Sequence, residues 1–295
     1  MTNSFKGTVA IIQFPGVNCE DETALAVRSA GLAAELFRWN EDPALLDEAI
    51  AVILPGGFSY QDRIRAGVVA AKDRIMDTLG DLARAGRPLL GICNGAQVLV
   101  ESGFIPGLHW ERVDFALAPN RMADREGYYC NWVFLRREKS SCIWTGSIDE
   151  GGIVPVPIAH AEGRFVTEDA GVLGEMKRND QIVLRYCTAT GEIDPAFPVN
   201  PNGSMENMAG VCNPEGNVLA MMPHPERATW LRQVPEDLPG PWGKERSRAA
   251  GDAAGLEKEG PGRRIFSSLI GGGGMMDRTG AGADAGAVRG EEDAP

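Results

Sequence analysis

The first half of the chain alternates short apolar runs with longer helical patterns, and this alternation limits the fold more than any other feature of the sequence. Residues 8–12, 34–37 and 51–54 are short, apolar and rich in β-branched side chains, as expected of strands buried on both faces of a sheet. Helical patterns occupy 21–31 and 64–85. Because strands that alternate with helices form right-handed crossovers, the sequence predicts an α/β fold with a mostly parallel, helix-covered sheet.

The second half is less regular and predicts additional strands, several of them antiparallel. The apolar segments expected to form these strands are 132–135, 153–158, 182–186 and 218–222. Residues 231–262 mix proline, glycine and alternating charges, so they predict a surface insertion, and 263–270 regain a helical pattern. One domain is therefore expected over 5–270. The glycine-rich, acidic tail at 271–295 has almost no bulky apolar residues and is expected to be disordered.

Composition excludes several classes of protein. The 295 residues are 43% hydrophobic, yet no run reaches the roughly 18 to 20 apolar residues of a membrane span, and no secretory signal begins the sequence. We therefore expect a cytoplasmic protein that does not contact membranes. Six cysteines without a C-x-x-C pair argue against a zinc site or a disulfide framework, so no metal is expected. A formal charge of −12 disfavours nucleic acid as a partner.

Cys93 has the surroundings of a nucleophile on a sharp strand-to-helix turn. It follows the apolar run 88–90 and is flanked by Gly91 and Gly95, at positions where a Cβ atom would collide with neighbouring elements. The apolar segment 96–102 predicts a helix whose free N–H groups favour a thiolate. A buried structural cysteine between two chance glycines is the alternative.

A cysteine nucleophile needs a base and a group that orients the base, and His224 and Glu226 are the candidates. His224 follows the apolar run 218–222, and two-residue spacing in extended backbone points both side chains the same way. A proline-rich turn with a surface histidine is the alternative. The N–H groups of Gly57 and Asn94 are the candidate donors to an oxyanion. The chemistry inferred is acyl transfer from an amide or ester through a thioester.

Several motifs resemble the class I glutamine amidotransferases, and more closely the glutaminase subunits of phosphoribosylformylglycinamidine synthases in purine biosynthesis. The resemblance covers roughly residues 5 to 230 and the helix near 263–270. It depends on these segments: 14–21 (FPGVNCED), 55–60 (PGGFSY) with Asp62 and 65–67 (RAG), 91–97 (GICNGAQ) with Leu99, Glu101 and Gly103, 130–133 (CNWV), 160–165 (HAEGRF), 216–222 (GNVLAMM) and 223–226 (PHPE).

The resemblance implies a flavodoxin-like amidotransferase domain in which Cys93 is the nucleophile, His224 the general base and acid, and Glu226 the orienting group. It further implies that Gly57 and Asn94 supply the oxyanion N–H groups and that a further residue, Gln97, helps to hold glutamine. Glutamine would be hydrolysed to glutamate. The ammonia would pass to a large synthetase subunit, often joined by a small third subunit, that converts formylglycinamide ribonucleotide to formylglycinamidine ribonucleotide.

No cofactor is expected on this chain, and ATP and magnesium would be used by the partner synthetase. In agreement, the sequence contains no G-x-x-x-x-G-K-[ST] phosphate loop. A γ-glutamyl peptidase or another related cysteine hydrolase is the alternative enzyme. A non-catalytic regulatory subunit is the alternative outside enzymes, although a complete triad counts against it.

The chain departs from the family pattern at two neighbouring positions. Gln61 stands where the family usually has a glycine, and Arg63 replaces a usual aromatic residue, so the local loop is expected to differ. His160 and Glu162 are interpreted as part of a structural turn or, alternatively, of a partner interface, and His109 has no assigned partner.

Overall fold

The computed structural model describes residues 5–122 and 126–271. Nine strands form one sheet in the order β2-β1-β3-β4-β11-β10-β9-β6-β7, and β5 and β8 form a two-stranded sheet. The strands are β1 Val9–Gln13, β2 Ala34–Arg38, β3 Ala51–Leu54, β4 Leu89–Ile92, β5 Ala116–Ala118, β6 Tyr129–Arg137, β7 Ile153–His160, β8 Arg164–Val166, β9 Ile182–Cys187, β10 Met208–Cys212 and β11 Val218–Met221. The helices are α1 Glu20–Ser29, α2 Ile75–Arg84, α3 Asn94–Glu101, α4 Ala170–Arg178, α5 Pro241–Arg248, α6 Ala253–Leu256 and α7 Arg263–Gly271.

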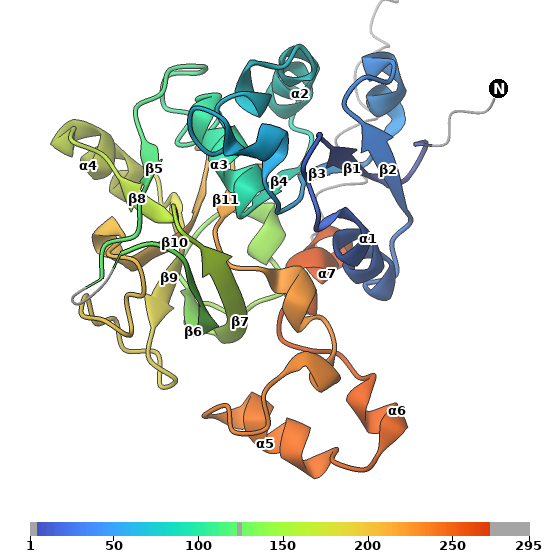
Figure 1. The fold of residues 1–295 in the computed structure, drawn as a ribbon, viewed down its shortest axis with the longest axis vertical. Helices are drawn as coiled ribbons and strands as arrows, with labels where there is room; N and C mark the ends of the chain where they lie inside the picture. Colours follow the sequence, from blue (N-terminus) through green and yellow to red (C-terminus); the bar gives the residue numbers. More distant parts are fainter. Residues whose placement is uncertain (1–4, 123–125, 272–295) are drawn as a thin grey trace, which may run out of the picture.

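The sheet confirms the predicted α/β class. The five strands from β2 to β11 pair in parallel, and β10, β9, β6 and β7 continue the sheet with antiparallel pairs. The parallel strands β1, β3, β4 and β11 are almost wholly buried, which explains why each is a continuous apolar run. In Figure 1, α1 packs on β1 and β2 with α7 beside it, and α3 packs on β3, β4 and β11.

The strand order reverses at β1, and this reversal positions the site. From β1 the chain crosses to β2 on one side and returns to β3 and β4 on the other, so right-handed crossovers place α1 and α2 on opposite faces. Ligands of such sheets bind beyond the carboxyl ends of the strands at the reversal. The loops after β1, β3, β4 and β11 all emerge at this edge.

The helix predicted over 64–85 is shorter than expected, because α2 begins only at Ile75. Ile64 was expected on the apolar face, but its side chain is 94% exposed and its φ is +72°. The preceding loop has positive φ at Tyr60, Gln61 and Asp62, a conformation that no helix can include. Gln61 has a φ of +62°, the left-handed region that favours the glycine usual in the family, and its side chain accepts a hydrogen bond from Arg63.

Four elements have no counterpart in the sequence predictions: β5, β8, β10 and α4. Residues 231–262 also contain two short helices, α5 and α6, that a lack of apolar periodicity had concealed. The tail predicted to be disordered from 271 lies outside the described residues, except for Gly271, which ends α7 and so belongs to the helix instead. Within 5–122 and 126–271, none of the helices is long and apolar enough to cross a membrane.

Candidate active site

Cys93 lies at a strained turn between β4 and α3. Its backbone has φ +49° and ψ −105°, a region that residues with a side chain rarely adopt and that is typical of nucleophiles on strand-to-helix turns. The thiol is 7% exposed and donates a hydrogen bond to the Ala159 carbonyl oxygen at 3.7 Å. The predicted position at the amino end of a buried helix is confirmed.

The two glycines around Cys93 are required by their neighbours, as the sequence predicted. A Cβ on Gly91 would lie 2.6 Å from the Gly95 carbonyl oxygen, and a Cβ on Gly95 would overlap the Leu54 carbonyl oxygen of β3. Real Cβ contacts are essentially never this short. The close packing of α3 against β3 and β4 therefore depends on glycine at both positions.

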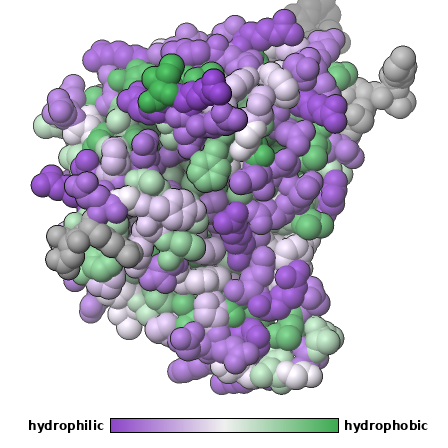
Figure 2. All heavy atoms as spheres, viewed as in Figure 1, coloured by the Kyte–Doolittle hydropathy of each residue, from purple (hydrophilic) through white to green (hydrophobic). Residues whose placement is uncertain are grey.

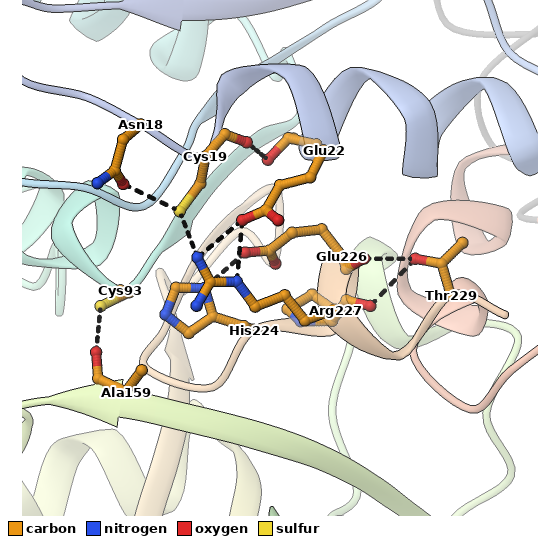
Figure 3. Close-up of polar contacts among 11 residues, drawn as sticks. Asn18, Cys19, Glu22, Cys93, Ala159, His224, Glu226, Arg227 and Thr229 are labelled. Carbon is orange, nitrogen blue, oxygen red and sulfur yellow. Dashed lines mark hydrogen bonds and ion pairs between the residues drawn. The ribbon is translucent and has the colours of Figure 1, made fainter. Parts of the chain in front are cut away.

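His224 and Glu226 lie next to Cys93, on the loop that follows β11. The parallel pairing of β4 with β11 places the carboxyl ends of these two strands side by side, which brings the histidine to the thiol. Nδ1 of His224 is 2.5 Å from Oε1 of Glu226, and both side chains are buried. Figure 3 shows the imidazole ring with Cys93 on one side and Glu226 on the other. The alternative of a surface histidine in a proline-rich turn is therefore wrong.

Charges around His224 favour its protonated form. Burial works to lower the pKa of His224, but the carboxylate of Glu226 and the neighbouring thiol groups outweigh it and raise this pKa well above its ordinary value. Nε2, the nitrogen not bonded to Glu226, is buried and has no hydrogen-bond partner among the described residues. The ring is thus oriented by one carboxylate and keeps its second nitrogen available.

Two backbone amides at the site donate no hydrogen bond to another backbone group in the described part of the chain. Gly57 pairs with Val17 in an antiparallel bridge whose hydrogen bonds are made by the flanking residues, Phe58 to Gly16 and Asn18 to Gly56. In this geometry the Gly57 N–H points away from its partner. The Asn94 N–H is the first of α3 and has no acceptor within the helix. Both amides therefore have the character expected of oxyanion donors.

Gln97 and Asn94 belong to one hydrogen-bonded network in the pocket wall. The Asn94 side chain accepts from the Ser59 N–H at 2.9 Å and donates both to Asp62 and to the Gln97 amide oxygen. Gln97 in turn donates to the Glu162 carbonyl oxygen at 2.7 Å. The network ties the loop after β3, helix α3 and the loop after β7 into one wall of the pocket.

Two carboxylates line the pocket that contains Cys93, and the sequence had assigned neither of them to it. Asp62 and Glu162 border this pocket together with Gly57, Cys93 and Gln97. Burial first, and the charge of Glu162 second, raise the pKa of Asp62 to about 6. Neither carboxylate pairs with a cation in the part of the chain that the structure describes. In the sequence, Asp62 stands out only because it closely follows the PGGFSY segment, and the sequence predicts no role for it.

His160 lines the same pocket as a neutral side chain whose Nε2 can accept a hydrogen bond. Its Nδ1 bonds to Oδ1 of Asn120, which also accepts from the Gly163 N–H, so Nδ1 carries the proton. Burial, followed by the charge of His224, lowers the pKa of His160 to about 3. Nε2 is buried and unpartnered among the described residues. The buried side chain agrees with the structural interpretation of this motif. His109 pairs instead with Asp114 at the surface.

Cys19, His224 and Glu226 offer donor atoms within 4.8 Å of one another, a spacing that suits a metal ion. The guanidinium of Arg227 lies 3.2 Å from the Cys19 sulfur, however, and a cation in that place opposes a second one. The Nδ1 atom of His224 is also already bonded to Glu226. These contacts fit a thiol in a hydrogen-bonded cluster better than a metal ligand.

The fold and the site together define a class of protein: an α/β amidotransferase with a cysteine on the turn after a central strand and a histidine–glutamate pair beside it. The chain belongs to the CobB/CobQ-like glutamine amidotransferase domain family, whose model matches residues 6–256.

Individual relatives of the chain carry more specific names than the domain family does. A protein from Methanothrix thermoacetophila named phosphoribosylformylglycinamidine synthase subunit PurQ is 49% identical over 268 residues, 88% of this chain and 96% of that protein. A protein of the same name from Pyrococcus furiosus is 43% identical over 220 residues, 75% of this chain and 88% of that one. A solved chain of PurLQS from Thermotoga maritima is 30% identical with a TM-score of 0.66, covering 90% of this chain and 98% of that chain.

Proposed function

We propose that this chain is the glutaminase subunit of a phosphoribosylformylglycinamidine synthase. It hydrolyses glutamine and delivers ammonia to a synthetase subunit, which converts formylglycinamide ribonucleotide to formylglycinamidine ribonucleotide. The observation that carries the proposal is the meeting of Cys93, His224 and Glu226 at the carboxyl ends of β4 and β11. The names of relatives that match most of the chain support the particular reaction.

The geometry supports a two-step mechanism through a thioester. The Cys93 thiolate attacks the side-chain carbonyl of glutamine, and the oxyanion that forms accepts hydrogen bonds from the Gly57 and Asn94 amides. Protonated His224 gives its proton to the departing nitrogen as the carbon–nitrogen bond breaks, and ammonia leaves. Neutral His224 then takes a proton from water, which attacks the thioester and releases glutamate and the thiolate. Glu226 orients the ring in both steps.

The pocket wall suits an amino acid substrate. Glutamine carries an α-ammonium group, and we assign its recognition to Asp62 and Glu162, which line the pocket without a cation of their own among the described residues. The α-ammonium group would offset the burial and the charge of Glu162 that together raise the pKa of Asp62. Gln97, fixed by Asn94 and the Glu162 carbonyl oxygen, would hold the rest of the substrate.

The ATP-dependent step belongs to the partner in this proposal. We assign ATP and magnesium to a large synthetase subunit, and a small third subunit to the same complex. The relation of this chain to a solved chain of PurLQS from Thermotoga maritima supports an assembly of this kind. The ammonia made at Cys93 would have to reach the synthetase without loss to solvent.

The decisive experiment compares the two nitrogen sources in the assembled synthase. A glutamine-mimicking alkylator is expected to label Cys93, and Cys93→Ala should abolish glutamine-dependent synthesis while ammonia-dependent synthesis persists. An alanine variant that still hydrolysed glutamine would show that the nucleophile is elsewhere. Fast hydrolysis by the free chain, unchanged when the synthetase is added, would favour the γ-glutamyl peptidase alternative. A chain that neither binds the alkylator nor hydrolyses glutamine in the complex would be a regulatory subunit.

A further inference from the structure

Cys19 is a second buried thiol at the site that the proposed reaction does not use. It precedes α1, is 1% exposed, and its amide donates to the Gly56 carbonyl oxygen at 3.2 Å. Its carbonyl oxygen accepts from the Thr23 N–H and hydroxyl groups. The sulfur is therefore held in place by backbone contacts to both the loop after β3 and the start of α1.

The Cys19 sulfur contacts charged and polar groups on several sides. Nη2 of Arg227 donates to it at 3.2 Å, and the thiol donates to Oδ1 of Asn18 at 3.4 Å. Nε of Arg227 also donates to Glu22 of α1 at 2.9 Å. Burial raises the pKa of Cys19, so the group is a neutral thiol that accepts from a guanidinium. Figure 3 shows this cluster directly above the imidazole.

The sulfur also borders the imidazole of His224. A Cβ built on Gly56 would lie 2.8 Å from Cε1 of His224 and 3.1 Å from the Cys19 sulfur, so ring edge and sulfur approach the same point. Donor atoms of Cys19, His224 and Glu226 all lie within 4.8 Å of one another. Only a glycine at position 56 leaves room for the thiol against the ring.

We propose that Cys19 is a positioning residue for the His224–Glu226 pair. Its sulfur, anchored by Arg227 and Asn18, restrains the Cε1 edge of the imidazole, while Glu226 restrains Nδ1. The assignment rests on the proposed function, since it is through His224 that Cys19 acts. It also gives a role to the cysteine that precedes α1, whose side chain makes no helix-capping hydrogen bond.

The consequence is a change in the titration of His224 when the sulfur is removed. Among the described residues, the titratable and charged groups that face His224 include Cys19, Cys93, Tyr128, His160, Glu226 and Arg227. Of these, the Cys19 sulfur lies against the edge of the ring and favours its charged form. Removing the sulfur should therefore lower the pKa of His224.

The test is the pH profile of Cys93 alkylation in the full chain assembled with its synthetase. The alkylation rate is measured with a glutamine-mimicking diazoketone, and mass spectrometry confirms the labelled residue. Cys19→Ala should move the alkaline limb of the profile down by about one pH unit. Cys19→Ser, whose hydroxyl can still accept from Arg227, should show a smaller shift than Cys19→Ala. Cys187→Ala is the matched control, because this cysteine is equally buried but does not line the pocket.

The outcomes separate the inference from the function. One outcome is that Cys19→Ala and the control Cys187→Ala both lower thermal stability while their pH profiles superimpose on that of the unmodified chain. In that case Cys19 is a packing residue, and the inference is overturned. If Cys19→Ala does not fold, the Cys19→Ser profile decides in the same way. If the unmodified chain is not labelled at Cys93, it is the proposed function that fails.

Discussion

At the scale of single residues, burial and neighbouring charges set the protonation state of each titratable group in the site. His224 is held protonated by Glu226, while His160, which lines the same pocket, is held neutral by burial and by the charge of His224. Two histidines in one pocket thus take different protonation states. The first can donate a proton to a leaving group, and the second can only accept one hydrogen bond at Nε2.

Asp62 makes the binding of glutamine depend on pH. Its raised pKa of about 6 means that the carboxylate is charged above that pH and becomes neutral as the pH falls through it. The KM for glutamine should therefore rise below about pH 6, and Asp62→Asn should raise it at least about tenfold at neutral pH and remove this acid limb. Steady-state glutaminase assays across this range check the expectation.

A substrate analogue isolates the group that Asp62 recognises. Glutaramate has the amide of glutamine but lacks the α-ammonium group, so its hydrolysis should be equally poor in the unmodified chain and in Asp62→Asn. The ratio of kcat/KM for glutamine over glutaramate should shrink in Asp62→Asn. An unchanged ratio would remove Asp62 from substrate recognition, and ammonia-dependent synthesis by the same preparation shows that the complex is intact.

At the scale of elements, the active cysteine is placed by the contact of α3 with the sheet. Helix α3 starts directly after Cys93 and crosses β3 and β4 so closely that Gly91 and Gly95 can carry no side chain. The strain at Cys93 is sustained by this packing, because every residue of α3 is buried. The turn is therefore a property of two elements and not of the pentapeptide alone.

Gly95→Ala should separate α3 from β3 and destabilise the fold. The new Cβ would overlap the Leu54 carbonyl oxygen, which is backbone and cannot rotate away, so a loss of about 3 kcal/mol in the free energy of unfolding is expected. Gly146→Ala is a suitable control, since its Cβ would meet nothing closer than 3.5 Å and its φ is −62°. Denaturant unfolding of both variants provides the comparison, and equal stabilities would contradict the packing argument.

At the scale of the whole molecule, residues 231–262 form a lobe with a small core of its own. Leu231, Val234, Leu238 and Ala249 are buried together there and pack on Trp132 and Phe134 of β6. Backbone hydrogen bonds from Leu231 to Lys258 and from Gly260 to Thr229 close the base of this lobe. It projects from the main body in Figure 1, and Figure 2 shows a mostly hydrophilic face with scattered apolar patches.

Because the 231–262 lobe has a small core of its own, we expect that it can loosen without loss of the active site. Leu231→Ala should create a cavity that costs about 2 to 5 kcal/mol locally, so limited proteolysis within 235–258 should accelerate while glutaminase activity is retained. Leu79→Ala, an equally buried leucine of the main core, should instead lower the stability of the whole chain. Similar losses of global stability in both variants would show that the lobe and the main core unfold as one unit.

The sequence alone predicted most of the fold of the first half and the three residues placed at the centre of the site. Buried parallel strands are uninterrupted apolar runs, and a turn such as Gly91–Gly95 needs glycine at fixed positions, so both features are local and can be read in order. Strand β10 and helix α4 were missed because neither has a distinctive local pattern: β10 contains a glycine, and α4 is only partly buried. Ile64 was misplaced because spacing alone does not reveal positive φ.

Only the tertiary structure decided which side chains face the thiol. The pairing of β4 with β11 brings His224 to Cys93, and the start of α1 brings Cys19 to the ring from the far end of the sequence. Asp62 came into the pocket from the loop after β3, and His160 and Glu162 came from the end of β7 and the loop that follows it. Their protonation depends on burial and on charges that are distant along the chain, and these are properties of the folded molecule that no local pattern contains.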